Sequence, residues 1–181
     1  MQIATIGHGA RPLEDFLATL AAGGVEQVLD VRAYPGSRRY PWFGRERLTD
    51  ALADAGVGYH WLPALGGRRK AGPTAQDHPG WRIEAFRNYA GYMDEPGFDQ
   101  ALSDLLALAN ERHAAVMCAE THPSQCHRRL IADRLTTLGH EVRHLISPMR
   151  VEAHALTPFL RREGEHWRYD AGAGTGQLDL R

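Results

Sequence analysis

Apolar positions recur with two different spacings along the chain. Short runs of aliphatic and β-branched residues predict five strands, over residues 2–8, 26–32, 58–62, 114–119 and 141–146. Between the first two runs the spacing is helical, because Leu13, Phe16 and Leu20 lie on one face of a helix over residues 11–23. The same spacing predicts helices over 45–55, 82–92, 98–112 and from about Ser124 to Leu138. Strands and helices therefore alternate.

This alternation predicts an α/β fold, with a mostly parallel five-stranded sheet that carries helices on both faces. We expect residues 1–150 to form this domain. Residues 151–170 are expected to be a small C-terminal extension packed on it, with a hairpin around Glu163-Gly164. The Gly-rich residues 171–181 are expected to be a disordered tail.

Composition narrows the class of protein. The 43% hydrophobic and 24% charged residues are ordinary for a globular protein. No stretch has the roughly 18 uncharged apolar residues of a membrane span. The start of the chain lacks the basic region of a secretory signal, and the 2 cysteines are too few for a disulfide scaffold. A cytoplasmic location without a membrane partner is the expectation.

The charged residues are balanced in number but clumped in position. A net charge of −1 argues against a generally basic nucleic-acid binder. Local basic patches can still bind anions, and the basic residues cluster at Arg38-Arg39, Arg68-Arg69-Lys70, Arg128-Arg129 and Arg161-Arg162. Neither a Walker A loop nor a G-x-G-x-x-G sequence is present, which disfavours NTPases and dinucleotide enzymes.

Unusual polar residues follow four of the predicted strands. Ligands of open α/β sheets bind beyond the carboxyl ends of the strands. The polar residues at these ends are His8, Asp30 and Arg32 with the following Arg38-Arg39, Arg68, and Cys118 and Glu120 with the following Cys126-His127-Arg128. Because scattered surface charge would not follow strand ends in this way, we expect one shared cleft.

Four of these residues are candidates for catalysis. Cys126 falls in or near the first turn of a predicted helix, beside His127, where free N–H groups and cations lower the pKa of a thiol. Cys118 would face the same crevice as a second thiol, although buried cysteines often serve only as small hydrophobes. Glu120 and His8 are candidate proton carriers.

Arginines dominate the predicted binding residues because guanidinium groups bind phosphate and carboxylate bidentately. The opening of the helix near Ser124 would offer N–H groups to the same anion. Asp30 is expected to pair with Arg32 or Arg11 rather than to act in catalysis. The residues assigned to substrate binding are Arg11, Arg32, Arg38, Arg39, Arg68, Tyr89, His127 and Arg128.

Metal binding is a competing interpretation of the same segment. Cys118, His122, Cys126 and His127 place four possible zinc ligands within ten residues. Structural zinc sites usually pair ligands two to four positions apart, and no second pair lies elsewhere in the sequence. We therefore assign no metal, and the sequence names no cofactor.

Several short motifs, taken in order, resemble the domain-of-unknown-function family numbered 488 over about residues 3–146. They are Thr5-Ile6-Gly7-His8, Asp30-Val31-Arg32, Ser37-Arg38-Arg39, Leu65-Gly66-Gly67-Arg68, Phe86-Arg87 with Tyr89, Met117-Cys118-Ala119-Glu120 and Cys126-His127-Arg128. The resemblance implies a small prokaryotic α/β protein and supplies no reaction. It also implies that both cysteines, Glu120, His127 and Arg128 belong to the site.

Three functions fit these observations. The first is an enzyme acting on a small anionic substrate, phosphorylated and including nucleotides or nucleic-acid ends as possibilities. The second is a non-catalytic module that binds nucleotides or nucleic acid and stacks bases on Tyr40, Trp42, Tyr89 and Tyr92. The third is a thiol or metal sensor built on the Cys-His segment. The sequence favours the enzyme and leaves the oligomeric state open.

Overall fold

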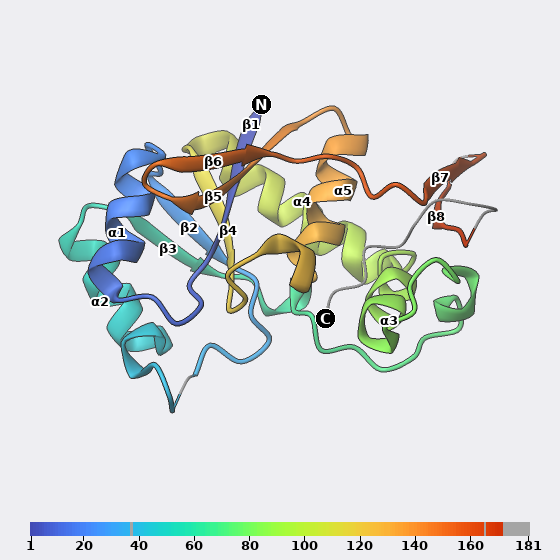
Figure 1. Ribbon diagram of the computed structural model, residues 1–181, viewed down its shortest axis with the longest axis horizontal. Coiled ribbons are helices and arrows are strands. Elements are labelled where there is room, and N and C mark those ends of the chain that lie inside the picture. Colours follow the sequence, from blue (N-terminus) through green and yellow to red (C-terminus); the bar gives the residue numbers. More distant parts are fainter. Residues whose placement is uncertain (37, 165, 172–181) are drawn as a thin grey trace.

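The computed structural model describes residues 1–36, 38–164 and 166–171 and shows a mixed α/β fold (Figure 1). A six-stranded sheet has the order β3-β2-β4-β1-β5-β6. Its first five strands are parallel: β1 (Gln2–Gly7), β2 (Gln27–Asp30), β3 (Gly58–Trp61), β4 (Ala114–Cys118) and β5 (Glu141–Ser147). The predicted fold class, a mostly parallel sheet, is confirmed.

The sixth strand, β6 (Arg150–Ala153), was not predicted. It runs antiparallel to β5 after a turn at Pro148-Met149. Because β6 has only four residues and its side chains are exposed or half-buried, it carries no apolar run that a sequence pattern could reveal. The predicted hairpin around Gly164 is present as β7 (Leu160–Glu163) and β8 (His166–Tyr169). Most of the predicted tail, residues 172–181, lies outside the described residues, as does Ser37.

Helices cover both faces of the sheet, as expected (Figure 1). On one face lie α1 (Leu13–Ala22) and α2 (Arg45–Asp54), whose apolar side chains form one core with Ala4, Ile6 and Met117. On the other lie α4 (Pro96–Glu111) and α5 (Arg128–Thr137), with α3 (Glu84–Tyr92) beside them. Short 3-10 turns are η1 (Pro41–Phe43), η2 (Pro63–Leu65), η3 (Ala75–Asp77) and η4 (Pro123–Gln125). None of the described helices has the length and hydropathy needed to cross a membrane.

The predicted start of the last helix is wrong. The 3-10 turn η4 occupies Pro123–Gln125, and Cys126 is extended, with φ −137° and ψ 144°. The Ser124 N–H donates to the His122 ring rather than entering a longer helix, and the Cys126 N–H returns to the Pro123 carbonyl. The helix α5 therefore begins only at Arg128, and Cys126 precedes it. No helix N-terminus opens at Ser124 to hold an anion.

The connections of the sheet open a crevice between β2 and β4. From β2 the chain passes through α2 to β3 at one edge, whereas from β4 it passes through α5 to β5 on the other side. Loops that leave two neighbouring strands in opposite directions form the usual ligand crevice of an open α/β sheet. Alternation along β4 places Cys118 on the same face as Val116, toward the layer that contains α5.

Candidate functional site

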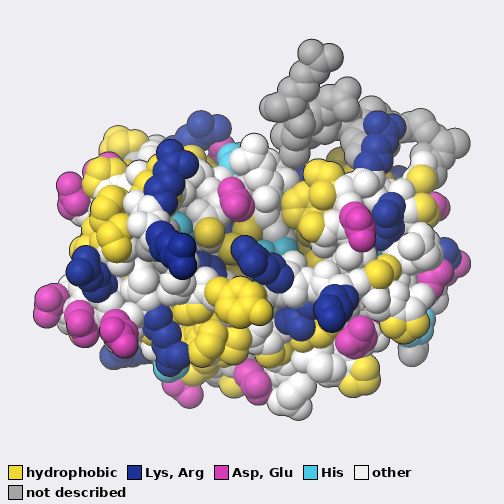
Figure 2. Space-filling view, turned by 90° about the horizontal axis from the view of Figure 1, so that it is seen from below, with side chains coloured by type: hydrophobic (Ala, Val, Ile, Leu, Met, Phe, Trp, Pro, Cys, Tyr) yellow, Lys and Arg dark blue, Asp and Glu magenta, His cyan; other side chains and the backbone are white. Residues whose placement is uncertain are grey.

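Two adjacent hollows lie beyond the carboxyl ends of the strands. We call the first the thiol pocket; it has a volume of about 280 Å³ and is lined by Cys118, Cys126, His127, Gly67, Arg68, Ala33, Ala85 and Phe86. We call the second the histidine pocket; it has a volume of about 430 Å³ and is lined by His8, Gly9, Ala10, Gly36, Arg39, Tyr40 and Thr121. Both also include Arg32, Tyr34, Ala119, Glu120 and Gln125, so together they form one cleft. Figure 2 looks onto this end of the molecule, where Lys and Arg side chains gather.

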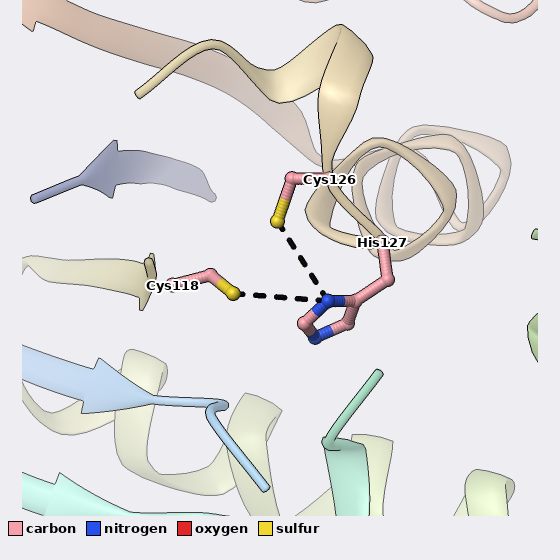
Figure 3. Close-up of side chains that lie close together, drawn as sticks. All are labelled: Cys118, Cys126 and His127. Atoms are coloured by element: carbon pink, nitrogen blue, oxygen red, sulfur yellow. Dashed lines mark hydrogen bonds between the residues drawn. The ribbon is translucent and has the colours of Figure 1, made fainter. Parts of the chain in front are cut away.

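Cys118, Cys126 and His127 converge at the floor of the thiol pocket (Figure 3). The His127 Nδ1 atom lies 3.8 Å from Cys118 Sγ and 3.7 Å from Cys126 Sγ. The three donor atoms lie within 4.8 Å of one another, and all three residues are buried. The extended backbone at Cys126 turns its sulfur toward β4, while His127 approaches from the start of α5. Two thiols eight positions apart thus share one imidazole.

The two thiols have opposite pKa shifts. Burial opposes charge on Cys126, but the hydrogen bond from the Cys118 thiol and the positive charge of Arg128 outweigh it and hold the pKa of Cys126 well below its usual value. The same hydrogen bond, together with burial, raises the pKa of Cys118. The backbone N–H of Arg128 also donates to Cys126 Sγ, over 3.5 Å. Of the two thiols, Cys126 is therefore the one that loses its proton more readily.

His127 is held in place by its packing. Its ring lies 5.0 Å from the ring of Tyr89, which is fully buried and donates its hydroxyl to the Leu65 carbonyl. On another side stands Gly67, where a Cβ would come within 2.4 Å of His127 Nδ1. Among the described residues, His127 Nε2 is buried and has no hydrogen-bond partner. The ring thus presents Nδ1 to both sulfurs.

The Arg128 side chain supports the backbone next to the site. It is 1% exposed, and its guanidinium donates to the carbonyls of Glu120 and Thr121 and to the Thr5 hydroxyl. These bonds hold the loop that follows β4. Close packing leaves no room for a side chain at Gly7, where a Cβ would lie 1.8 Å from the Glu120 carbonyl oxygen.

Asp30 and Arg32 form a buried ion pair at the end of β2, which confirms the expected pairing. Arg32 Nη2 lies 2.6 Å from Asp30 Oδ2, and Arg32 also donates to the Phe43 carbonyl. Tyr59 donates its hydroxyl to the same carboxylate. The pair joins β2, β3 and η1, and Arg32 forms part of the wall between the two pockets.

His8 is buried in the wall of the histidine pocket. Its ring stacks on Phe43, with ring centres 4.3 Å apart, and its Nδ1 lies 2.9 Å from the Gly9 carbonyl oxygen. Burial, with a smaller contribution from the positive charge of Arg32, lowers the pKa of His8 to about 4. The ring is therefore neutral near pH 7. Its Nε2 faces Arg32 Nη1 at 3.4 Å.

Arg39 and Arg68 are the exposed arginines of the cleft lining. The Arg68 guanidinium lies over the Tyr34 ring, 5.6 Å from its centre, and the Arg39 guanidinium lies 5.4 Å from the centre of the Tyr40 ring. Glu120 is exposed and borders both pockets. Stacking on an aromatic ring directs each guanidinium without consuming its N–H donors, so both can meet an anion.

The remaining predicted residues lie apart from the cleft surface. Arg38 is exposed but is not part of either lining. Arg11 donates to the Ile146 carbonyl and the Thr19 hydroxyl, which ties the start of α1 to β5. Tyr89 and Arg128 lie behind the cleft surface. Tyr89 packs against His127, and Arg128 supports the loop after β4. Which lining residues touch a substrate stays a prediction.

Sequence reasoning missed several lining residues, among them one tyrosine, one glutamine and one phenylalanine. Tyr34 is 73% exposed at the rim, Gln125 borders both pockets, and Phe86 reaches the thiol pocket from α3. Tyr34 follows Arg32 at a strand end already considered, and Gln125 directly precedes Cys126, so position alone could have identified both. Nothing in the spacing of Phe86 distinguishes it from a core residue.

The comparisons with known proteins identify a family. The family model described as "Domain of unknown function DUF488" matches residues 12–135. The chain belongs to DUF488. The resemblance drawn from the short motifs is therefore confirmed, and the matched DUF488 range contains both cysteines and His127 but begins after His8. Neither the curated proteins nor the solved structures gave a match.

Proposed function

We propose that this DUF488 protein is a thiol-dependent enzyme that acts on a small anionic substrate, with Cys126 as the nucleophile. The observation that carries the proposal is the position of the Cys126 sulfur. It lines an open cleft, faces the Arg128 N–H and the His127 ring, and lies in the same pocket as the exposed Arg68. A sulfur surrounded by donors is well suited to nucleophilic catalysis.

The rim of the cleft favours an anion. Arg68 and Arg39 are exposed at this rim, and their guanidinium N–H groups are suited to bidentate contacts with phosphate or carboxylate. Glu120 also lies there, and its carboxylate would repel an anion unless the substrate occupied the arginine side. The exposed ring of Tyr34 offers a surface for a base, which favours nucleotides among phosphorylated substrates.

The reaction would proceed through a covalent adduct. The Cys126 sulfur would form a bond to the electrophilic atom, and the leaving group would depart with the electron pair of the broken bond. Glu120 would pass a proton to the leaving group; water or an acceptor would then give a proton back to Glu120 as it attacks the adduct, breaks the bond to sulfur and restores the Cys126 thiolate. Cys118, hydrogen-bonded to Cys126, would keep the attacking sulfur oriented.

Anion binding is tested by thermal shift with inorganic phosphate, sugar phosphates and nucleotides, because a ligand of the native state raises the melting temperature. We expect the Arg68→Ala variant to lose most of the shift. Arg47→Ala removes the same charge from the exposed surface of α2 and should keep it. Equal shifts in both variants would contradict an anion site at Arg68.

The nucleophile is tested by alkylation of metal-free protein with iodoacetamide and mass mapping. We expect Cys126 to react at least tenfold faster than Cys118, and bound anion to slow this reaction. The Cys126→Ser variant should still bind anion. A Cys126 that remains unmodified while unfolded protein reacts fully would refute the nucleophile. Anion binding without turnover of any bound compound would favour the non-catalytic module.

A further inference from the structure

We infer that Cys118, Cys126 and His127 also form a site for one divalent ion of the zinc type, with its fourth position open to the cleft. The inference does not depend on the proposed catalytic reaction. The sequence offered four candidate ligands and did not distinguish among them. The fold brings three of these together, namely the two cysteines and the histidine that follows one of them. Figure 3 shows all three side chains directed at one point.

The separations between donor atoms fit a tetrahedral ion. Zinc binds cysteine sulfur at about 2.3 Å and histidine nitrogen at about 2.0–2.1 Å, so tetrahedral angles place a nitrogen and a sulfur roughly 3.6 Å apart and two sulfurs roughly 3.8 Å apart. The two measured nitrogen–sulfur separations are 3.8 Å and 3.7 Å. The sulfurs also lie within the 4.8 Å that encloses the group.

The residues around the three donor atoms hold them in an orientation suited to binding a metal ion. Tyr89 and Gly67 orient the His127 ring with Nδ1 toward the sulfurs. The Arg128 N–H donates to Cys126 Sγ, and backbone N–H groups of this kind commonly support metal-bound thiolates. Binding through Nδ1 requires the ring proton on Nε2, which is buried and has no hydrogen-bond partner among the described residues.

Three protein ligands leave one coordination position unfilled. All three residues line the thiol pocket, so the fourth position faces its volume of about 280 Å³. Sites with three protein ligands and an open position are characteristic of exchangeable or catalytic zinc, whereas structural zinc has four ligands. An ion bound here would hold both sulfurs and would withdraw Cys126 from nucleophilic attack. Zinc would therefore control access to the thiolate.

His122 provides a matched control for the histidine ligand. The sequence made it an equal candidate, but its Nδ1 lies 2.7 Å from the Ser124 hydroxyl and its Nε2 lies 3.7 Å from a Glu152 oxygen. It is not part of the group of donors that includes the two sulfurs. Loss of metal from His127→Ala but not from His122→Ala would place the ion where the geometry indicates.

The experiment titrates reduced, chelator-stripped protein with Co²⁺ and then with Zn²⁺. We expect one equivalent of Co²⁺ to produce the strong visible bands of tetrahedral thiolate coordination, and Zn²⁺ to abolish them. The variants Cys118→Ser, Cys126→Ser and His127→Ala should weaken binding by more than the roughly 10–100-fold typical of outer-shell changes. Wild-type protein without these bands at several equivalents would overturn the site, whether or not the variants fold.

Failure of this site and failure of the proposed enzyme give different results. If metal-free wild-type protein shows rapid alkylation of Cys126 but no cobalt bands, the metal site is wrong and the nucleophile stands. If the bands appear but metal-free Cys126 is inert, the metal site stands and the nucleophile is wrong. Where both hold, one equivalent of Zn²⁺ should protect both cysteines from iodoacetamide.

Discussion

At the scale of single residues, the site depends on two glycines that leave room for other groups. Gly7 ends β1 where Arg128 and the Glu120 carbonyl pack against it. Gly67 stands against the His127 ring. Neither position needs an unusual backbone angle, since neither has positive φ. A glycine is required at both positions because a larger side chain would collide with its neighbours. A substitution therefore acts by displacing the neighbouring group.

Replacing Gly7 with alanine should therefore destabilise the protein. The new Cβ would overlap the Glu120 carbonyl oxygen at 1.8 Å and crowd Arg128 Nη2 at 2.6 Å. We expect a loss of about 1–3 kcal/mol or more in the free energy of unfolding, measured by urea denaturation. In the control Gly36→Ala the new Cβ meets no described atom within 4 Å, and the unfolding free energy should be nearly unchanged. Equal stability of the two variants would contradict this packing.

At the scale of elements, a buried polar chain links the C-terminal segment to the site. Asp133 on α5 accepts from His154, whose other ring nitrogen meets His144 on β5 at 3.0 Å. The remaining nitrogen of His144 meets the Thr5 hydroxyl on β1, and Arg128 donates to that hydroxyl. The segment after β6 is thus connected, through β5 and β1, to the arginine that supports the loop after Cys118.

Asp133 is the anchor of this connection. Its carboxylate also accepts from the N–H and hydroxyl of Thr157 and from the hydroxyl of Tyr169. In Asp133→Asn the amide cannot accept from all of these donors. We expect a loss of about 1–3 kcal/mol for each donor left unpaired, measured by chemical denaturation. Tyr169→Phe removes one donor and should cost only about 1 kcal/mol; a larger loss than in Asp133→Asn would argue against the anchor.

The strands, the helices and the carboxyl ends of the strands could be predicted from the sequence. Which partners each polar side chain contacts could not. Short apolar runs identified the parallel strands, helical spacing identified the helices between them, and strand ends predicted the cleft that contains Cys118, Glu120 and Arg68. Arg128 and Arg68 look equivalent in sequence, yet Arg128 is consumed by backbone carbonyls that no local pattern reveals. The choice of His127 over His122 depends on the turn at Pro123, which ends one residue before Cys126.

At the scale of the whole molecule, each helical layer encloses a neutral histidine. His8 stacks on Phe43 in the layer of α1 and α2, and His144 lies between Thr5 and His154 on the other side of the sheet. Burial, helped by nearby positive charges, lowers the pKa of His8 to about 4 and that of His144 to about 3. Both rings are uncharged in the folded protein at neutral pH.

These two histidines make the fold sensitive to acid. Below the unfolded pKa of about 6.5, the unfolded chain binds protons that the folded chain does not, so stability falls as the pH decreases toward 4 and then 3. Each histidine contributes at most about 1.4 kcal/mol per pH unit. Urea denaturation at pH 7, 6 and 5 should show this decline, with a shallower slope in His144→Asn. An unchanged slope in that variant would contradict a buried neutral His144.

The position of β4 has a consequence for how the protein is made. This strand lies between β1 and β2, which are neighbours in the chain but share no ladder. β1 and β2 therefore cannot pair with the strand that joins them until residues 114–118 have been synthesised. A nascent chain halted on the ribosome before that point should remain open to protease, and release of the fourth strand should join the first two strands into one sheet and position Cys118 at its edge.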